Sequence, residues 1–302
     1  MTILVWLVLC VIWGSTWIFI KIGLQDLPPI TFAVARFLAA VLLLAPVIVI
    51  GKLPLPRTRA EWKLIAFTGV LQFSVNYSTV FWAEQYITSG LAAVLQAMIT
   101  PFGLLLAWVF LPAERITKLK VMAVGIGLLG VAVIFLDHLK IDNMMAFAGS
   151  AAIVVGAYAA AQASILLKAR GSSLHPASLV WSQMICGLPL IIIYALIAEG
   201  NPLSFNWTTS AVLCVLYLTV AGTIAAFWLY YWLLNRIEST RAMMISLVTP
   251  LLAVIIGAIV LGETLPPQTT IGGVLIIGSI GLIVFRKGLF NAKQKSHGDP
   301  EM

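Results

Sequence analysis

Ten stretches of about 20 mainly apolar residues follow one another along this chain of 302 residues. A stretch of that length forms a helix long enough to cross the roughly 30 Å hydrocarbon core of a bilayer. Helices satisfy their own backbone hydrogen bonds, which a bilayer demands. The sequence therefore predicts an all-α integral membrane protein with ten transmembrane helices. Their approximate bounds are 3–22, 30–50, 63–83, 90–111, 119–136, 146–168, 176–198, 209–232, 240–261 and 269–286.

The composition agrees with a membrane protein. Hydrophobic residues make up 61% of the chain and charged residues 10%, whereas about a quarter of the residues of a soluble domain are charged. The first apolar stretch lacks the basic segment of a cleaved signal peptide, so we expect it to be a span. The net charge is +7, but binding of nucleic acid needs a basic face on a soluble module, and the sequence predicts no such module. No nucleic-acid partner is therefore expected.

Positive charge is distributed unequally between the two sides of the predicted topology. With a cytoplasmic N-terminus, all but three of the 18 Lys and Arg residues fall in cytoplasmic loops or the tail. The exceptions are Lys21 and Lys140 outside and Arg36 within the second span. This asymmetry predicts cytoplasmic N- and C-termini in the cell (inner) membrane. Residues 288–302 are expected to be a disordered cytoplasmic tail.

A duplicated pattern relates the two halves of the chain. Thr100-Pro101 and Thr249-Pro250 each precede an apolar run, and an offset of 149 positions that aligns them also aligns Glu114 with Glu263. Five spans per half is an odd number, so the second copy begins on the opposite side of the membrane, as in transporters with inverted repeats. We expect one five-helix repeat over residues 1–137 and a second, inverted repeat over residues 138–287.

Pro101 and Pro250 fall near the middle of the predicted fourth and ninth spans. A proline inside a helix leaves the carbonyl four residues earlier without its hydrogen bond, here that of Ala97 or Ser246. In a bilayer such a carbonyl is tolerated where protein or a wet cavity takes it up. Helix kinks at corresponding depths therefore favour a shared central cavity. Kinks that serve packing alone are the alternative.

Polar and aromatic residues inside the spans are the candidates for substrate contact, because polar groups are costly in a bilayer. Spacings of three or four residues place Trp13 with Thr16, and Gln72 with Asn76, on one helix face. Helix-to-helix hydrogen bonding or packing is the alternative role. The candidate set is Trp13, Thr16, Gln72, Asn76, Tyr77, Gln96, Thr100, Tyr158, Gln162, Trp228, Ser246 and Thr249.

Three charged residues near the outer ends of spans, Lys21, Arg36 and Glu84, are candidates for gating or ion coupling. A lone guanidinium inside a span is costly, so Arg36 is expected to have a partner, and Glu84 is the candidate. A structural ion pair is the alternative, and for Arg36 it is the favoured one. The three cysteines fall within spans and the three histidines in loops and tail, so no metal site, disulfide framework or cofactor is expected.

Three short motifs stand out in the spans. They are Trp13-Gly14-Ser15-Thr16-Trp17 in the first span, Pro29 with Phe32-Ala33 and Arg36-Phe37 in the second, and the run from Pro250 to Gly262-Glu263 in the ninth. Together they resemble the drug/metabolite transporter superfamily, EamA type, over nearly everything from Trp6 to Phe285. The chain departs from that pattern at Pro112-Ala113-Glu114, where the family usually has Leu-Gly-Glu. The resemblance implies transport of small metabolites, often efflux, across a bacterial-type cytoplasmic membrane.

The residues favour a secondary transporter that works by alternating access. No nucleotide-binding loop is present, so ATP is not the direct energy source. Neutral polar residues mixed with Trp and Tyr favour an amino acid or an amphipathic or aromatic solute as substrate. A lipid-linked carrier or headgroup flippase is the alternative, and a membrane enzyme is disfavoured because the acids are single and dispersed. The expected partners are a small-molecule substrate and the lipid bilayer, for a monomer or homodimer.

Overall fold

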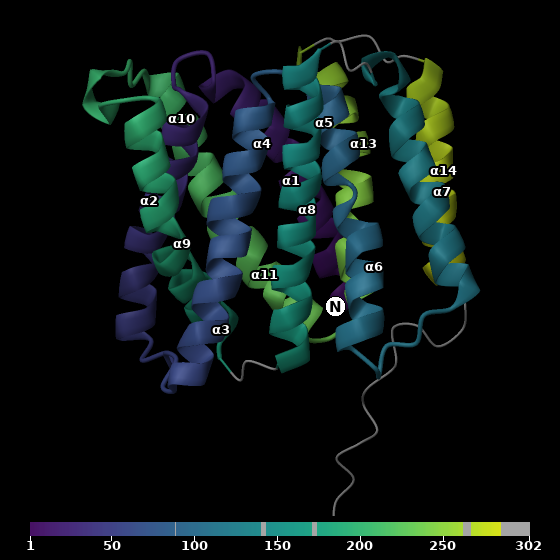
Figure 1. Cartoon of the computed structure of the whole chain (residues 1–302), viewed down its shortest axis with the longest axis horizontal. Helices are drawn as coiled ribbons and strands as arrows, with labels where there is room; N and C mark the ends of the chain where they lie inside the picture. The colour runs from purple at the N-terminus through teal and green to yellow at the C-terminus, as the bar shows by residue number, and fades with distance from the viewer. Residues whose placement is uncertain (88, 140–142, 171–173, 262–266, 285–302) are drawn as a thin grey trace, which may run out of the picture.

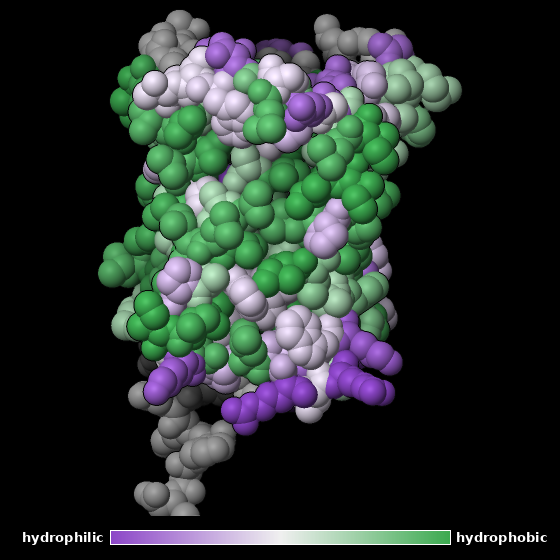
Figure 2. Space-filling view, turned by 90° about the vertical axis from the view of Figure 1, so that its left-hand side faces the viewer, coloured by the Kyte–Doolittle hydropathy of each residue, from purple (hydrophilic) through white to green (hydrophobic). Residues whose placement is uncertain are grey.

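Helices run side by side through the whole molecule (Figure 1), and no strand occurs in the part of the chain that the computed structural model describes. That part comprises residues 1–87, 89–139, 143–170, 174–261 and 267–284. On the face shown in Figure 2, a broad apolar band crosses the middle of the bundle, and polar side chains gather at its two ends. This surface matches the hydrocarbon core of a bilayer and its two aqueous interfaces.

The helices of the first half begin with the uninterrupted α1 (Thr2–Gly23) and α2 (Pro29–Ile50). The third apolar stretch consists of three consecutive segments, α3 (Arg59–Gly69), η1 (Val70–Asn76) and α4 (Tyr77–Ala83). The fourth is divided into α5 (Ser89–Gln96) and α6 (Ile99–Phe110). The fifth is α7 (Lys118–Ile134), followed by the short turn η2 (Leu136–His138).

The second half repeats this order. It begins with α8 (Met144–Arg170) and α9 (Pro176–Ala198), after which comes the short turn η3 (Pro202–Ser204). The next stretch is again threefold, with α10 (Thr209–Thr219), η4 (Val220–Ala225) and α11 (Ala226–Leu234). A divided stretch follows, α12 (Ser239–Met243) and α13 (Ile245–Leu261), and then α14 (Pro267–Val284).

Eight helical stretches among the described residues are long and apolar enough to cross a membrane. The protein is therefore an all-α membrane protein, as the sequence predicts. The remaining two of the ten expected spans correspond to α7, which has 17 residues, and to α14, which is apolar but also short. The expected tail at 288–302 and Glu263 lie outside the described residues.

Two π-helical segments interrupt α-helices at equivalent places in the two halves, η1 in the third stretch and η4 in the eighth. The sequence predicts continuous helices here, so these segments are an unforeseen feature. A π turn widens the helix and shifts its hydrogen bonds from the i+4 to the i+5 pattern, and such turns are frequent at functional sites. Ser74 in η1 donates from Oγ to the carbonyl of Gly187 in α9 at 2.6 Å, which ties the wider turn to its neighbour.

The divided helices break close to the prolines but not at them. α5 ends at Gln96 and α6 begins at Ile99, so Pro101 stands in the first turn of a new helix, where proline is tolerated. The carbonyl of Ala97 accepts the backbone N–H of Thr100 at 3.1 Å, so the chain itself takes up this group. Pro250 lies inside α13.

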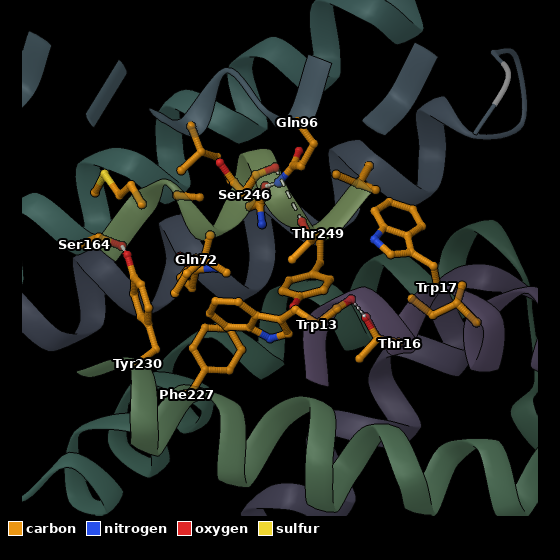
Figure 3. Close-up of a pocket in the computed structure, with 18 of the residues that line it drawn as sticks. Trp13, Thr16, Trp17, Gln72, Gln96, Ser164, Phe227, Tyr230, Ser246 and Thr249 are labelled. Carbon is orange, nitrogen blue, oxygen red and sulfur yellow. Dashed lines mark hydrogen bonds between the residues drawn. The ribbon is translucent and has the colours of Figure 1, made fainter. Parts of the chain in front are cut away.

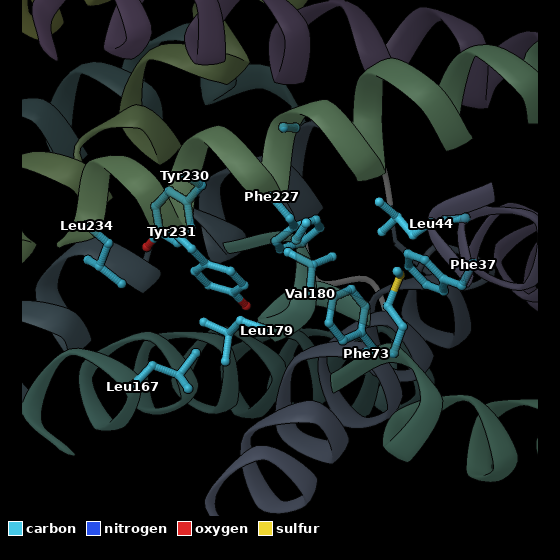
Figure 4. Close-up of a cluster of buried hydrophobic side chains, with 14 of the residues drawn as sticks. Phe37, Leu44, Phe73, Leu167, Leu179, Val180, Phe227, Tyr230, Tyr231 and Leu234 are labelled. Carbon is cyan, nitrogen blue, oxygen red and sulfur yellow. The ribbon is translucent and has the colours of Figure 1, made fainter. Parts of the chain in front are cut away.

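The largest buried cluster lies between α1, α2, η1, α9 and α11, where aromatic rings pack on one another (Figure 4). Phe37 of α2 packs edge-to-face on Phe73 of η1, with ring centroids 5.3 Å apart. At the opposite side of the bundle α7 and α14 lie against each other (Figure 1). Their backbones approach so closely that a Cβ on Gly130 would lie 2.7 Å from the carbonyl oxygen of Gly272. Glycine is therefore required at this crossing.

Candidate functional site

A cavity of about 190 Å³ opens in the middle of the bundle, where both halves meet (Figure 3). Its walls come from α1, α2, the third and fourth stretches of the first half, and α8, α11, α12 and α13 of the second. Most of this lining is apolar, with a few polar groups between. The lining residues are Trp13, Thr16, Trp17, Ile20, Arg36, Gln72, Asn76, Tyr77, Val80, Phe81, Glu84, Gln96, Ile99, Ala160, Ser164, Phe227, Tyr230, Ala242, Met243, Ile245, Ser246 and Thr249.

One wall is aromatic. Figure 3 shows Trp13 of α1 beside Phe227 and Tyr230 of α11, and the Trp13 ring centroid lies 5.7 Å from that of Phe227 and 5.3 Å from that of Tyr230. The Trp13 indole N–H donates to the carbonyl of Gly222 in η4 at 3.4 Å. Tilted and edge-to-face pairs of this kind hold the rings in fixed positions. The wall is therefore a preformed surface for an apolar or aromatic group.

Amide side chains form the wall across from the aromatic one. Gln96 at the end of α5 donates from Nε2 to Oδ1 of Asn76 in η1 at 2.9 Å. Gln96 Oε1 is buried and has no hydrogen-bond partner among the described residues. Ser246 and Thr249 of α13 lie beside Gln96 in the cavity (Figure 3). This wall can therefore offer donors and acceptors to a polar group.

Arg36 and Glu84 also line the cavity, but no ion pair joins them within the described part of the chain. The hydrogen bonds of Arg36 go instead to η4, where Nε and Nη2 donate to Oγ1 of Thr223 at 3.1 and 3.0 Å. Nη2 also donates to the carbonyl of Gly222 at 3.3 Å. The partners of Arg36 are thus a hydroxyl and a main-chain carbonyl, and not the acidic side chain of Glu84 that the sequence predicts.

Glu84 directly follows Ala83, the last residue of α4. Its side chain is half-buried and lines the cavity. Burial penalises the charged form and raises the pKa of this carboxyl to about 7. The carboxyl can therefore exchange a proton near neutral pH.

Five residues predicted from sequence lie away from the cavity lining. Thr100 is fully buried behind it and donates from Oγ1 to the carbonyl of Met243 at 2.9 Å. Trp228 packs against the ring of His175. Lys21 is exposed and is not among the lining residues.

The other two, Tyr158 and Gln162, belong to α8. Ala160 and Ser164 of α8 face the cavity, and a residue two positions away points about 200° around the helix. Tyr158 is accordingly 40% exposed on the outer surface, and Gln162 lines a separate surface depression. α8 approaches α4 through Gly156, where a Cβ would collide with Oγ1 of Thr79.

The cavity also contains residues absent from the predicted binding set, notably Trp17, Ser164, Phe227 and Tyr230. The hydroxyl of Tyr230 donates to Oγ of Ser164 at 3.2 Å. Trp17 lies four residues after Trp13, so helical spacing alone places both on one face. Phe227 and Ser164 carry no such signal, because an apolar ring and a small residue are ordinary in any span.

An ionic cluster lies next to the cavity at the end of the bundle where the N-terminus lies. Glu114, just after α6, pairs with Lys168 of α8 at 2.6 Å and also accepts the hydroxyl and backbone N–H of Ser239. Lys120 of α7 pairs with Glu238 at 3.0 Å. Both pairs join the first half to the second. Ser239 starts α12, whose residues Ala242 and Met243 line the cavity, so the cluster lies close to this part of the cavity wall.

No group of three or more His, Cys, Asp or Glu side chains among the described residues is placed to hold a metal ion. The described residues that line the cavity thus offer aromatic rings, amides and hydroxyls, with Arg36 as their one cation and Glu84 as their one acid.

Residues 1–136 and 147–285 each match the model of the EamA-like transporter family. The chain belongs to that family. A relative named "uncharacterized inner membrane transporter YedA" from Escherichia coli K12 is 32% identical, with 94% of this chain and 91% of that protein covered. The "probable amino-acid metabolite efflux pump" of Salmonella typhimurium is 28% identical, with 92% and 93% covered.

A solved crystal structure shares the fold of this EamA-like transporter. It superposes with a TM-score of 0.80 at 15% identity and covers 94% of this chain and 96% of the other. Family and relatives are named as transporters rather than enzymes, and the fold supplies the membrane-spanning helices that a transporter needs. The chain is thus a small-molecule membrane transporter.

Proposed function

We propose that this EamA-like protein is a secondary transporter that exports an amino acid or an amphipathic or aromatic solute. The solute occupies the central cavity and moves by alternating access. The observation that carries this proposal is the cavity itself, because helix interruptions of both halves line it, between Gln96 and Ile99 and between Met243 and Ile245. In transporters, broken helices near mid-depth mark the substrate site.

The proposed topology has ten spans in two inverted repeats, residues 1–137 and 138–287, with α7 and α14 as the fifth span of each. Support comes from the family model, which matches each half once, and from η1 and η4, which interrupt corresponding helices. The charge asymmetry of the loops favours cytoplasmic termini. The cell membrane is the proposed location, since YedA is named an inner membrane protein.

Alternating access requires that one end of the cavity be closed while the other is open. The cluster of Glu114, Lys168, Lys120 and Glu238 is the proposed closure at the cytoplasmic end, because both of its ion pairs join the two halves. Such pairs exchange for water when the halves separate, so they can form and break in each cycle.

The lining favours the proposed substrate class. The aromatic wall of Trp13, Phe227 and Tyr230 suits an apolar or aromatic body, and Gln96 with Asn76 suits a polar head. A relative named as a probable amino-acid metabolite efflux pump agrees with export of this class.

Counterflow in proteoliposomes tests the proposal. Proteoliposomes that contain the purified protein are loaded with unlabelled solute. Uptake of labelled amino acids and amphipathic solutes is then measured for wild type, Trp13→Ala and Trp108→Ala. Trp108 is the matched control because it is 68% exposed on the outer face of α6. We expect exchange that falls about tenfold or more in Trp13→Ala and stays unchanged in Trp108→Ala. Absence of exchange for every solute, with translocation of labelled lipid headgroups instead, would replace the proposal with a flippase.

A further inference from the structure

Arg36 is deeply buried, with 3% of its surface exposed, and its charge has no acidic partner within the described part of the chain. Its three hydrogen bonds end on Thr223 and on the carbonyl of Gly222, which are neutral groups. They use Nε and Nη2 and leave Nη1 without a hydrogen bond. The guanidinium is therefore held in place but not neutralised.

An un-neutralised cation at this depth is costly in a membrane protein. The Phe37 and Tyr77 rings lie 5.1 and 5.5 Å from the guanidinium carbon and offset part of that cost. Ring faces attract a cation without carrying a negative charge. An anion that arrives with the substrate would complete the site.

The guanidinium borders the cavity next to Thr16 and Tyr77. Among the described residues that line the cavity it is the sole cation. The two N–H groups of Nη1 are left over, and a carboxylate oxygen can accept from them in a charge-assisted hydrogen bond. One cation suits one negative charge and disfavours groups with two, such as a phosphate monoester.

We propose that Arg36 binds the carboxylate of the transported solute, and that the cavity thereby selects solutes with one carboxylate and an apolar body. The inference rests on the proposed function, since it assigns a head group to the solute in the same cavity. The buried Oε1 of Gln96, which has no hydrogen-bond partner in the described part of the chain, is available to accept from an ammonium group of that solute. The aromatic wall holds the apolar body.

A purely structural Arg36 would act through η4, whose Gly222 carbonyl and Thr223 hydroxyl it binds. The two roles are separable. Thr223→Val removes two of the three hydrogen bonds of the guanidinium but leaves its charge beside the cavity. Arg36→Gln removes the charge and keeps a donor for η4.

The experiment uses matched pairs of solutes that differ in the carboxylate alone: phenylalanine with phenylalaninol, leucine with leucinol, and methionine with methioninol. Each is tested as a competitor of counterflow and for its effect on the unfolding temperature of the purified chain in detergent. Wild type is expected to prefer the acid over the alcohol by about tenfold to hundredfold, the range for a hydrogen bond to a charged group. Arg36→Gln should reduce that ratio to about one, while Thr223→Val should keep it.

The outcomes separate the two proposals. Two results would overturn the carboxylate site and leave the transport cavity intact. In the first, Arg36→Gln still prefers the acid over the alcohol. In the second, wild type shows no such preference, although it exchanges the solutes and Trp13→Ala abolishes that exchange. If no acid or alcohol competes or shifts the unfolding temperature, the transported solute class is wrong, and the carboxylate site falls with it. The carboxylate site is supported if Arg36→Gln loses the preference for the acid and still binds the alcohols as wild type does. A general structural defect would instead weaken the binding of both members of each pair.

Discussion

The ammonium of Lys168 lies 2.6 Å from a carboxylate oxygen of Glu114, and the pair joins the two halves of the transporter. The same carboxylate accepts both the hydroxyl and the backbone N–H of Ser239. Both charged side chains are mostly buried, with 16% of Lys168 and 10% of Glu114 exposed. One carboxylate thus fixes three elements at this end of the cavity.

Removing the ion pair of Glu114 and Lys168 should open the cavity at its proposed cytoplasmic closure. We expect Glu114→Gln and Lys168→Gln each to lower the unfolding temperature, and the double-mutant cycle to give a coupling of about 2 kcal/mol. A cysteine placed at Ala242, which lines the cavity next to the cluster, should react faster with an impermeant thiol reagent in Glu114→Gln than in wild type. Equal reaction rates from that side of the membrane would show that the pair does not close the cavity.

Two glutamines provide a matched comparison of cavity and surface. Gln96 lies in the cavity and donates to Asn76, whereas Gln162 lies in a surface depression on the outer side of α8. We expect Gln96→Leu to reduce counterflow about tenfold, because it leaves Asn76 unpaired and removes a polar group of the wall. Gln162→Leu should transport as wild type does. A larger loss in Gln162→Leu would contradict the cavity assignment.

Transport should depend on pH through Glu84. Burial raises the pKa of this carboxyl to about 7, so it is mainly neutral below pH 7 and mainly charged above it. We expect the counterflow rate to change between pH 6 and pH 8 in wild type, with a midpoint at about 7. Glu84→Gln should keep the low-pH rate across this range, since glutamine imitates the neutral acid. If the counterflow rate of Glu84→Gln depends on pH as that of wild type does, another group is responsible for the pH dependence.

The contact of α7 with α14 should tolerate no side chain at position 130. Gly130→Val places a Cβ 2.7 Å from the Gly272 carbonyl oxygen, and overpacking of this kind costs about 2 kcal/mol. Gly125 of the same helix is the control, because a Cβ there meets nothing within 4 Å. Thermal unfolding in detergent should be clearly lower for Gly130→Val than for Gly125→Val. Similar values for the two variants would mean that α7 and α14 separate at little cost.

Spans and shared helix faces could be predicted from the sequence because they depend on local spacing. Trp13 and Thr16, and Gln72 and Asn76, point to one cavity since three- and four-residue steps follow the helix. Tyr158 and Gln162 also share a face, but the spacing does not say which way that face turns. Ala160 and Ser164, on the opposite side of α8, are the residues of this helix that line the cavity.

The partner of Arg36 could not be predicted in the same way. The cost of a lone guanidinium in a span predicts an acidic partner, and Glu84 is the candidate that the sequence offers. The structure supplies Thr223 and a carbonyl of η4. A π-helical turn depends on packing against neighbouring helices, here α1 and α2 against η4, and no residue type marks it. A main-chain acceptor exposed by such a turn therefore has no sequence signal.

The π-helical segments also set the rotational phase of the helices that follow them. Adding or removing one residue turns every later side chain of a helix by about 100°. Tyr77 and Phe81 follow η1, and Phe227 and Tyr230 follow η4, so each group faces the cavity in the register that its wider turn dictates. A one-residue deletion in either segment would rotate these rings toward lipid while the span stayed long enough for the bilayer. The third helix of each half should thus accept exchanges of residues far more readily than changes in their number.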